Sequence, residues 1–283
     1  MPTARIASTT GPIDLYYEDT GQGFPLIWCH EYGGDYRSWE DQVRYFSRRY
    51  RVVAYNHRGY PPSSVPKGAS DYSQDLLVAD LLGLVKHLGL GPIHLVGCSM
   101  GANAARDFTL ANPGLVRSLT MVGAGAGSVS REQFLKAQAA TAAELDREGI
   151  GSLLRGFESL STRASFKQKD PRGFADFLRY AGEHDPQACA HLAREVMSKR
   201  KTVPELEAGL RGLRTPTLIM VGDQDAPCVE PSLMMRALLP HAGLDVFPAC
   251  GHTVNLEEPG LFNLHLTEFL AAVEAGRWAG WTR

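Results

Sequence analysis

The chain has 283 residues, of which 44% are hydrophobic and 21% are charged, and its formal net charge is −2. This composition is typical of a globular protein with a sizeable core, and it argues against nucleic acid or a membrane surface as a partner. No apolar run reaches the length of a membrane helix, and the N-terminus lacks the apolar core of a signal peptide.

The first part of the chain alternates strand-like and helix-like segments. Residues 13–18 alternate between apolar and polar side chains, which predicts a half-buried antiparallel edge strand. Apolar runs that predict buried strands follow at 25–29, 51–55, 93–96 and 119–122. Segments with helical spacing or composition lie between them, at 39–49, 71–88 and 102–110. This alternation predicts an α/β fold with a mostly parallel central sheet and helices on both of its faces.

The sequence Gly97-Cys98-Ser99-Met100-Gly101 lies between a predicted strand and a predicted helix. A strand that passes through G-x-S-x-G directly into a helix is typical of a nucleophile elbow, a sharp turn that exposes the serine oxygen. The alternative is a glycine-rich turn with an incidental serine, and the strand and helix on the correct sides weigh against it. We predict that Ser99 is a covalent nucleophile, and we interpret Cys98 as a packing residue.

The strand pattern stops at the glycine-rich stretch 123–127. From about residue 130 to about 213 the segments are helix-like, and the strand pattern resumes at 217–221. The alternative is that these helices simply cover the sheet, but there are too many of them for one crossover between two strands. We therefore predict an inserted all-helical cap, which would exclude water and shape a pocket. The predicted division is a core of residues 1–127 and 214–283, with a cap of residues 128–213.

A nucleophilic serine needs a base, and the base needs an acid that orients it. Asp225 comes just after the strand at 217–221, and His252 comes just after a strand at 244–247. Both positions lie past the carboxyl ends of strands, where α/β sheets place their chemistry. The chain order Ser99, Asp225, His252 is the order of the α/β hydrolases.

On these motifs the chain resembles the α/β-hydrolase superfamily over nearly its whole length. It is most similar to the capped serine-hydrolase branch, which holds esterases, lactonases and carbon–carbon hydrolases. The resemblance implies a catalytic triad of Ser99, His252 and Asp225. Asp225 rather than Asp223 matches the acid of the family's G-x-x-D turn, although Asp223 could substitute for it.

The resemblance also implies an oxyanion hole made of two backbone N–H groups. One belongs to Met100, directly after the nucleophile, and the other belongs by position to Tyr32 in the loop after the strand at 25–29. Glu31 stands where the family usually has glycine, and we assign it no catalytic role. Asn56 stands where relatives commonly have aspartate. We expect His30 and the Asn56 segment to hold the oxyanion loop in place.

The implied activity is that of a serine hydrolase on a small-molecule substrate. We expect hydrolysis of a carboxylic ester through an acyl-enzyme, because a serine at the elbow argues against epoxide hydrolases and dehalogenases, which use aspartate there. The alternatives are a carbon–carbon hydrolase of a ring-cleavage product, a lactonase, cofactor-free peroxide chemistry, or a ligand receptor that hydrolyses slowly. Carbon–carbon cleavage usually needs basic groups that hold a carboxylate, and the predicted cap offers Arg163, Lys167, Arg194 and Lys199.

The remaining expectations concern cofactors, location and assembly. The mechanism needs no metal and no organic cofactor, and the histidines around Cys189 lack the spacing of a catalytic zinc site. The cysteines are odd in number, scattered and without C-x-x-C spacing, which predicts reduced thiols in a cytoplasmic protein. The sequence is compatible with a monomer or a homo-oligomer.

Overall fold

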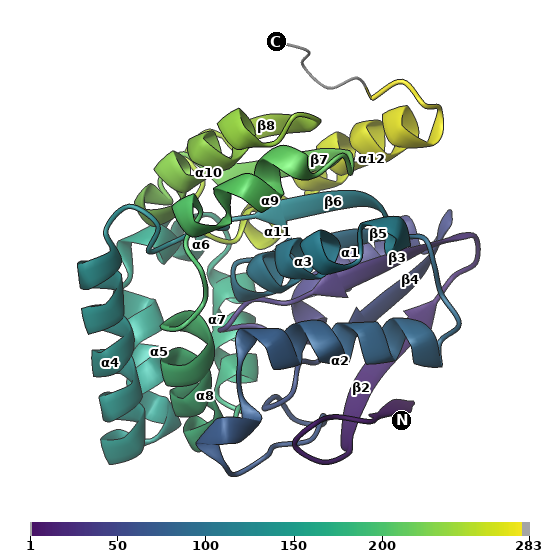
Figure 1. The fold of residues 1–283 in the computed structure, drawn as a ribbon. Helices are drawn as coiled ribbons and strands as arrows, with labels where there is room; N and C mark the ends of the chain where they lie inside the picture. The colour runs from purple at the N-terminus through teal and green to yellow at the C-terminus, as the bar shows by residue number, and fades with distance from the viewer. Residues whose placement is uncertain (1, 279–283) are drawn as a thin grey trace.

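The computed structural model describes residues 2–278. Its strands are, in chain order, β1 (Thr3–Ile6), β2 (Ile13–Thr20), β3 (Phe24–Cys29), β4 (Tyr50–Tyr55), β5 (Ile93–Cys98), β6 (Val116–Val122), β7 (Thr217–Gly222) and β8 (Ala242–Phe247). They form one sheet in the order β1-β2-β4-β3-β5-β6-β7-β8 (Figure 1). Strands β1 and β2 pair antiparallel, β2 pairs antiparallel with β4, and the remaining neighbours are parallel. The predicted mostly parallel α/β sheet is confirmed.

One expectation about the sheet is wrong. The sequence pattern predicted that the segment at 13–18 lies at the edge, but β1 pairs outside it, so that β2 lies between β1 and β4. The short β1 covers the alternating strand and itself shows alternate burial, with Ala4 and Ile6 buried in the core.

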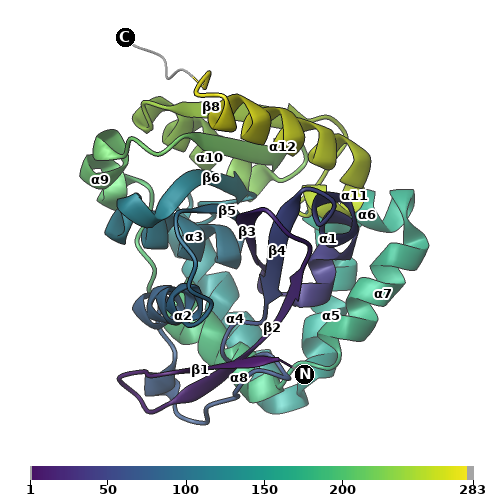
Figure 2. The same cartoon turned by 90° about the vertical axis from the view of Figure 1, so that its right-hand side faces the viewer.

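Helices cover both faces of the sheet (Figure 2). They are α1 (Glu40–Phe46), α2 (Gln74–His87), α3 (Met100–Ala111), α9 (Glu207–Gly212), α10 (Ala226–Leu238), α11 (Val254–Glu257) and α12 (Pro259–Glu274). Helices α2, α3, α9 and α10 contribute to the apolar cluster on one face, and α1 and α12 contribute to the cluster on the other. Successive residues of β3 enter opposite clusters, since Ile27 belongs to the first and Trp28 to the second. Apolar side chains therefore hold the sheet from both sides.

The segment between β6 and β7 is helical. It contains α4 (Arg131–Glu148), α5 (Ile150–Ser159), the 3₁₀ turn η4 (Ser161–Arg163), α6 (Ala164–Lys169), α7 (Pro171–Ala181), α8 (Pro186–His191), the π-helical turn η5 (Leu192–Met197) and the 3₁₀ turn η6 (Pro204–Leu206) before α9. Helices α4, α5, α7 and α8 gather at one side of the sheet (Figure 1). In the described part of the chain, no helix is both long enough and apolar enough to cross a membrane.

The helical segment has an apolar cluster of its own. Phe157, Phe166 and Phe177 pack there together with Tyr32 and Met100, which come from the predicted oxyanion hole. By contrast, Leu210 of α9 packs with the residues on one face of the sheet. The predicted cap boundaries at 128 and 213 stay a prediction, and this packing favours an earlier end of the cap, before α9.

Candidate active site

Ser99 lies in the turn between β5 and α3. Its backbone has φ +51° and ψ −110°, a conformation that costs a non-glycine residue roughly 1–3 kcal/mol. A Cβ on Gly97 would lie 2.4 Å from the carbonyl oxygen of Gly101, and one on Gly101 would lie 2.2 Å from that of Cys29. The turn can therefore be this tight only because positions 97 and 101 are both glycines. The Ser99 N–H donates to the Val122 carbonyl at 2.8 Å, which ties the turn to β6.

Cys98, the neighbour of Ser99 in the elbow, lies in the core. Its side chain belongs to the apolar cluster on the α1 and α12 face, and only 2% of the residue is exposed. Burial and nearby carboxylates raise the pKa of the Cys98 thiol well above its ordinary value. Since the thiolate is the reactive form, this thiol is a poor nucleophile.

His252 and Asp225 lie on loops that follow β8 and β7. The Nδ1 of His252 is 2.7 Å from Oδ2 of Asp225, and 1% of the Asp225 side chain is exposed. Burial disfavours the charged form of His252, but the charge and hydrogen bond of Asp225, with the charge of Glu31, outweigh it and raise the His252 pKa. Against an ionised carboxylate Nδ1 donates, which leaves Nε2 as an acceptor.

The rival acid Asp223 has a different position. Its side chain is exposed, and its Oδ1 accepts the backbone N–H of Cys250 at 3.2 Å. Asp223 therefore links the turn after β7 to the loop that carries His252, while Asp225 contacts the imidazole itself.

Glu257 also holds the His252 loop, a role that the sequence motifs did not predict. The buried carboxylate of Glu257 accepts the N–H of Gly251 at 2.8 Å and that of Thr253 at 3.1 Å, on either side of His252. It accepts the Ser165 hydroxyl as well, at 2.5 Å. A glutamate soon after a Gly-His turn was visible in the sequence, but its burial depends on the packing of α6 against α11.

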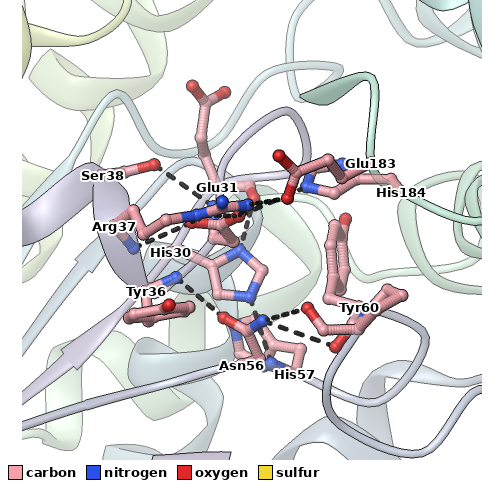
Figure 3. Close-up of polar contacts among 12 residues, drawn as sticks. His30, Glu31, Tyr36, Arg37, Ser38, Asn56, His57, Tyr60, Glu183 and His184 are labelled. Carbon is pink, nitrogen blue, oxygen red and sulfur yellow. Dashed lines mark hydrogen bonds and ion pairs between the residues drawn. The ribbon is translucent and has the colours of Figure 1, made fainter. Parts of the chain in front are cut away.

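The loop after β3 carries the predicted oxyanion donor, and His30 holds it in place. The Nε2 of His30 accepts the N–H of His57 at 3.1 Å, so Nδ1 carries the proton and donates to the Glu31 carbonyl at 2.7 Å (Figure 3). Burial lowers the pKa of His30 to about 4, which keeps the ring neutral. Asn56 accepts the Tyr36 N–H at 2.7 Å and donates to the Pro61 carbonyl at 2.8 Å. These uncharged hydrogen bonds show how asparagine serves where relatives commonly have aspartate.

The backbone at Tyr32 is held on both sides. The Glu31 carbonyl, which belongs to the same peptide group as the Tyr32 N–H, is bound by His30, and the Tyr32 carbonyl accepts the Tyr60 hydroxyl at 2.8 Å. The Tyr32 hydroxyl donates to the Cys189 carbonyl of α8 at 2.9 Å. Met100 is the first residue of α3, so its N–H has no partner within the helix. Both predicted donors thus have defined orientations.

The predicted nucleophile, base and acid line one cavity of about 320 Å³. Ser99, Asp225, His252, Glu31 and Tyr32 line it on the side of the sheet. The helical segment contributes mostly apolar walls, among them Phe134, Leu153, Phe157, Leu160 and Met197. The structure therefore brings the predicted nucleophile, base and acid together under an apolar cover.

Of the four basic residues that the sequence suggested, Arg163 alone lines this cavity in the described structure. Its Nη2 donates to Oε2 of Glu31 at 2.5 Å, and the two side chains are 3% and 4% exposed. Arg194 and Lys199 instead pair with acidic residues at the surface of the helical segment.

Arg200 also lines the cavity, although the sequence pattern did not predict this position. It is 4% exposed and donates to the Ala126 carbonyl at 3.0 Å, while its guanidinium lies 5.1 Å from the centre of the Phe134 ring. Burial lowers its pKa to about 10, so it stays charged at neutral pH. Among residues 2–278 no carboxylate lies within ion-pairing distance of it. Arg200 also borders a second groove, lined by Asp107 and Lys199.

Asp225, Cys228 and His252 place three ligand-type atoms within 4.8 Å of one another. Hydrogen bonding accounts for this cluster, since His252 binds Asp225 and the Cys228 thiol donates to the Gly123 carbonyl at 3.2 Å. Burial and the charge of Asp225 raise the pKa of Cys228 well above its ordinary value. Metal ligation uses the thiolate, which these surroundings disfavour.

Comparisons with known proteins agree with this architecture. Residues 25–259 match the family model described as alpha/beta hydrolase fold. The 2-hydroxy-6-oxononadienedioate/2-hydroxy-6-oxononatrienedioate hydrolase 2 of Pseudomonas putida is 28% identical, over 94% of this chain and 95% of that protein. A thermophilic esterase from Thermogutta terrifontis, solved with malate bound, has a TM-score of 0.86 and 28% identity, over 96% of this chain and 99% of that one.

The enol-lactonase from Burkholderia xenovorans LB400 has a TM-score of 0.83 at 20% identity, over 95% of this chain and all of that one, and shows the shared fold. Together these matches support a hydrolase. Because the family model spans most of the sequence, this chain belongs to the family of the alpha/beta hydrolase fold.

Proposed function

We propose that this protein hydrolyses a small-molecule carboxylic ester through Ser99, His252 and Asp225. The observation that carries the proposal is the 2.7 Å contact between His252 and the buried Asp225, in the same cavity as a serine at positive φ. The 28% identical thermophilic esterase supports the choice of an ester.

In the proposed mechanism, Nε2 of His252 accepts the Ser99 hydroxyl proton as Oγ attacks the ester carbonyl carbon. The carbonyl oxygen becomes an oxyanion, which accepts hydrogen bonds from the N–H groups of Tyr32 and Met100. The C–O bond to the alcohol breaks, and the alcohol leaves with the proton from His252. Water then gives a proton to His252 and attacks the acyl-enzyme, which releases the carboxylic acid and restores Ser99.

The test is hydrolysis of p-nitrophenyl esters of increasing acyl length by the wild type and by Ser99→Ala. We expect turnover by the wild type and its loss in Ser99→Ala, with the best acyl length set by the 320 Å³ cavity. Ser232→Ala is the matched control, because Ser232 is buried in α10 outside the cavity and its hydroxyl has no hydrogen-bond partner among the described residues. Full turnover by Ser99→Ala would reject the proposal.

A second candidate is carbon–carbon bond hydrolysis of an acid-bearing substrate, and Arg200 is the observation that favours it. A buried guanidinium without a carboxylate partner is costly, and a substrate carboxylate in the cavity would supply the missing charge. The Pseudomonas putida relative acts, by its name, on a dioate, and the thermophilic esterase holds malate. Supplying 2-hydroxy-6-oxononadienedioate and following the loss of its absorbance separates this candidate from the first.

A further inference from the structure

Glu31 places a carboxylate at the side of the predicted oxyanion hole. It immediately precedes Tyr32, it lines the same cavity as Ser99, and 4% of its side chain is exposed. Burial disfavours the charged form of Glu31, but the Arg163 and His252 charges outweigh it and hold its pKa below the ordinary value. Glu31 is therefore ionised. A bare negative charge here would oppose the negative charge that forms on the substrate oxygen.

Arg163 supplies the opposite charge from the helical segment. Besides its 2.5 Å bond to Glu31, its guanidinium lies 4.4 Å from the ring centre of Phe177 and 4.9 Å from that of Phe157. The same rings close over the oxyanion loop, since a Cβ on Gly33 would lie 2.7 Å from Cζ of Phe157. The aromatic packing thus limits where the guanidinium can move and keeps it against Glu31.

The residues on either side of Arg163 contact the other catalytic loop. The Thr162 carbonyl accepts the backbone N–H of His252 at 2.9 Å. Ser165 donates to Glu257, which in turn binds the N–H groups around His252. One short segment, residues 162–165, therefore contacts the His252 loop and the oxyanion loop at once.

We propose that Arg163 is a positioning residue that neutralises Glu31 beside the oxyanion hole, from a short segment that also contacts the His252 loop. The inference rests on the proposed function, because it gives Tyr32 and His252 their roles in catalysis. It also explains how this chain accommodates glutamate where the family usually has glycine, since the added charge comes with its own counter-charge.

The pair also sets the charge that His252 experiences. The titratable and charged groups around His252 are Asp225 after β7, Cys228 in α10, Glu31 after β3 and Arg163 in η4, with Cys250 and Glu257 in its own segment. Burial raises the pKa values of the Cys228 and Cys250 thiols, which are therefore neutral. Glu31 favours the protonated form of His252 and Arg163 disfavours it. Removing either partner alone should therefore move the titration of His252, in opposite directions.

The experiment is the pH profile of kcat/KM on the best p-nitrophenyl ester, beside an NMR titration of the His252 ring. In Arg163→Met, Glu31 has no counter-charge, so the His252 pKa should rise by about one pH unit. The acid limb of the profile, where kcat/KM falls as His252 is protonated, should move up by the same amount. In Glu31→Gln both should move down, and the double variant should titrate like the wild type. Arg163→Lys keeps the charge and should largely restore the wild-type profile.

Glu183→Gln is the matched control. It removes another ion pair between the helical segment and the loop after β3, in which Arg37 donates to Glu183 at 2.8 Å (Figure 3). Glu183 is 53% exposed and does not line the cavity, so the acid limb should not move. Glu31→Gln and the uncharged double variant carry the test independently of how stable Arg163→Met is.

The outcomes separate this inference from the proposed function. Shifts in the same direction for both single variants, or no shift in either, would overturn the role of Arg163 even where Ser99→Ala abolishes turnover. Turnover that survives Ser99→Ala rejects the proposed function instead. In that case opposite NMR shifts would still support the charge compensation, but not its role in catalysis.

Discussion

The two walls of the cavity hold a buried arginine in different ways. On the side of the oxyanion loop, Arg163 bonds to Glu31, and the pair carries no net charge. On the side of the loop after β6, Arg200 contacts a backbone carbonyl and an aromatic ring, with no carboxylate partner among residues 2–278. A paired buried charge has its counter-charge within the protein, whereas an unpaired one that lines a cavity is available to bind a ligand. The first wall is suited to positioning and the second to substrate selection.

Both walls border the cavity that His252 lines, and the largest expected effect comes from removing the acid that orients this histidine. Asp225→Asn should lower kcat about 10⁴-fold, because an asparagine amide favours the wrong imidazole tautomer. Asp223→Asn is the matched control, since the exposed Asp223 contacts only the loop backbone through one oxygen that asparagine retains. Steady-state kinetics on the best p-nitrophenyl ester measure both. A large loss in Asp223→Asn with little loss in Asp225→Asn would reverse the assignment.

Breaking the ion pair between Arg163 and Glu31 should lower the stability of the protein. Arg163→Met leaves the Glu31 carboxylate buried without its cation, and we expect a loss of roughly 3–5 kcal/mol in the free energy of unfolding. The double variant Glu31→Gln/Arg163→Met removes both charges and should recover most of that loss. Urea denaturation followed by circular dichroism gives the comparison. Equal stability of the single and double variants would show that the pair is not the source of the effect.

Removing the unpaired arginine should cost no stability. Arg200→Met deletes a buried charge that has no carboxylate partner, so the free energy of unfolding should stay the same or rise. For an ester that bears a carboxylate, kcat/KM should fall roughly 10-fold to 100-fold, the range expected when a charged hydrogen bond is lost. A neutral ester should be hydrolysed as by the wild type.

Arg194→Met provides the matched control for Arg200, because Arg194 is a half-buried arginine of the same segment that does not line the cavity. Equal losses on the acidic and the neutral ester in Arg200→Met would remove the argument for substrate selection by Arg200.

The difference between the walls also explains what could be predicted from the sequence. Ser99 and Asp225 follow fully buried strands, and His252 follows the edge strand β8 of the same mostly parallel sheet. Local pattern and topology together therefore place the three residues at one end of the strands, and all three line one cavity. The residues close to them in sequence were also predictable from local motifs, as the two glycines of the elbow show. The mostly parallel sheet followed from the same alternation of apolar runs and helical spacing.

The charged groups from the helical segment have no such local signal. Arg163 was one of four basic residues, and its burial depends on packing between α5, α7 and the oxyanion loop. Arg200 stands in the polar run Ser198-Lys199-Arg200-Lys201, whose composition is typical of a solvated face. It lies shortly after the π-helical turn η5 and lines the cavity. Such positions follow from tertiary contacts that a single sequence does not display.

The smallest expected effect concerns the pH dependence of kcat/KM in the wild type. The proposed mechanism needs neutral His252, and Asp225 and Glu31 favour its charged form more than burial opposes it. The His252 pKa is therefore higher than the ordinary value of about 6.5, so kcat/KM should fall as the pH drops through a value above 6.5. Because buried pairs are screened little by salt, this acid limb should change little between low salt and about 0.5 M salt. An acid limb below 6.5 in the wild type would mean that burial outweighs the carboxylates, and that Arg163 offsets more of the charge of Glu31 than the contacts indicate.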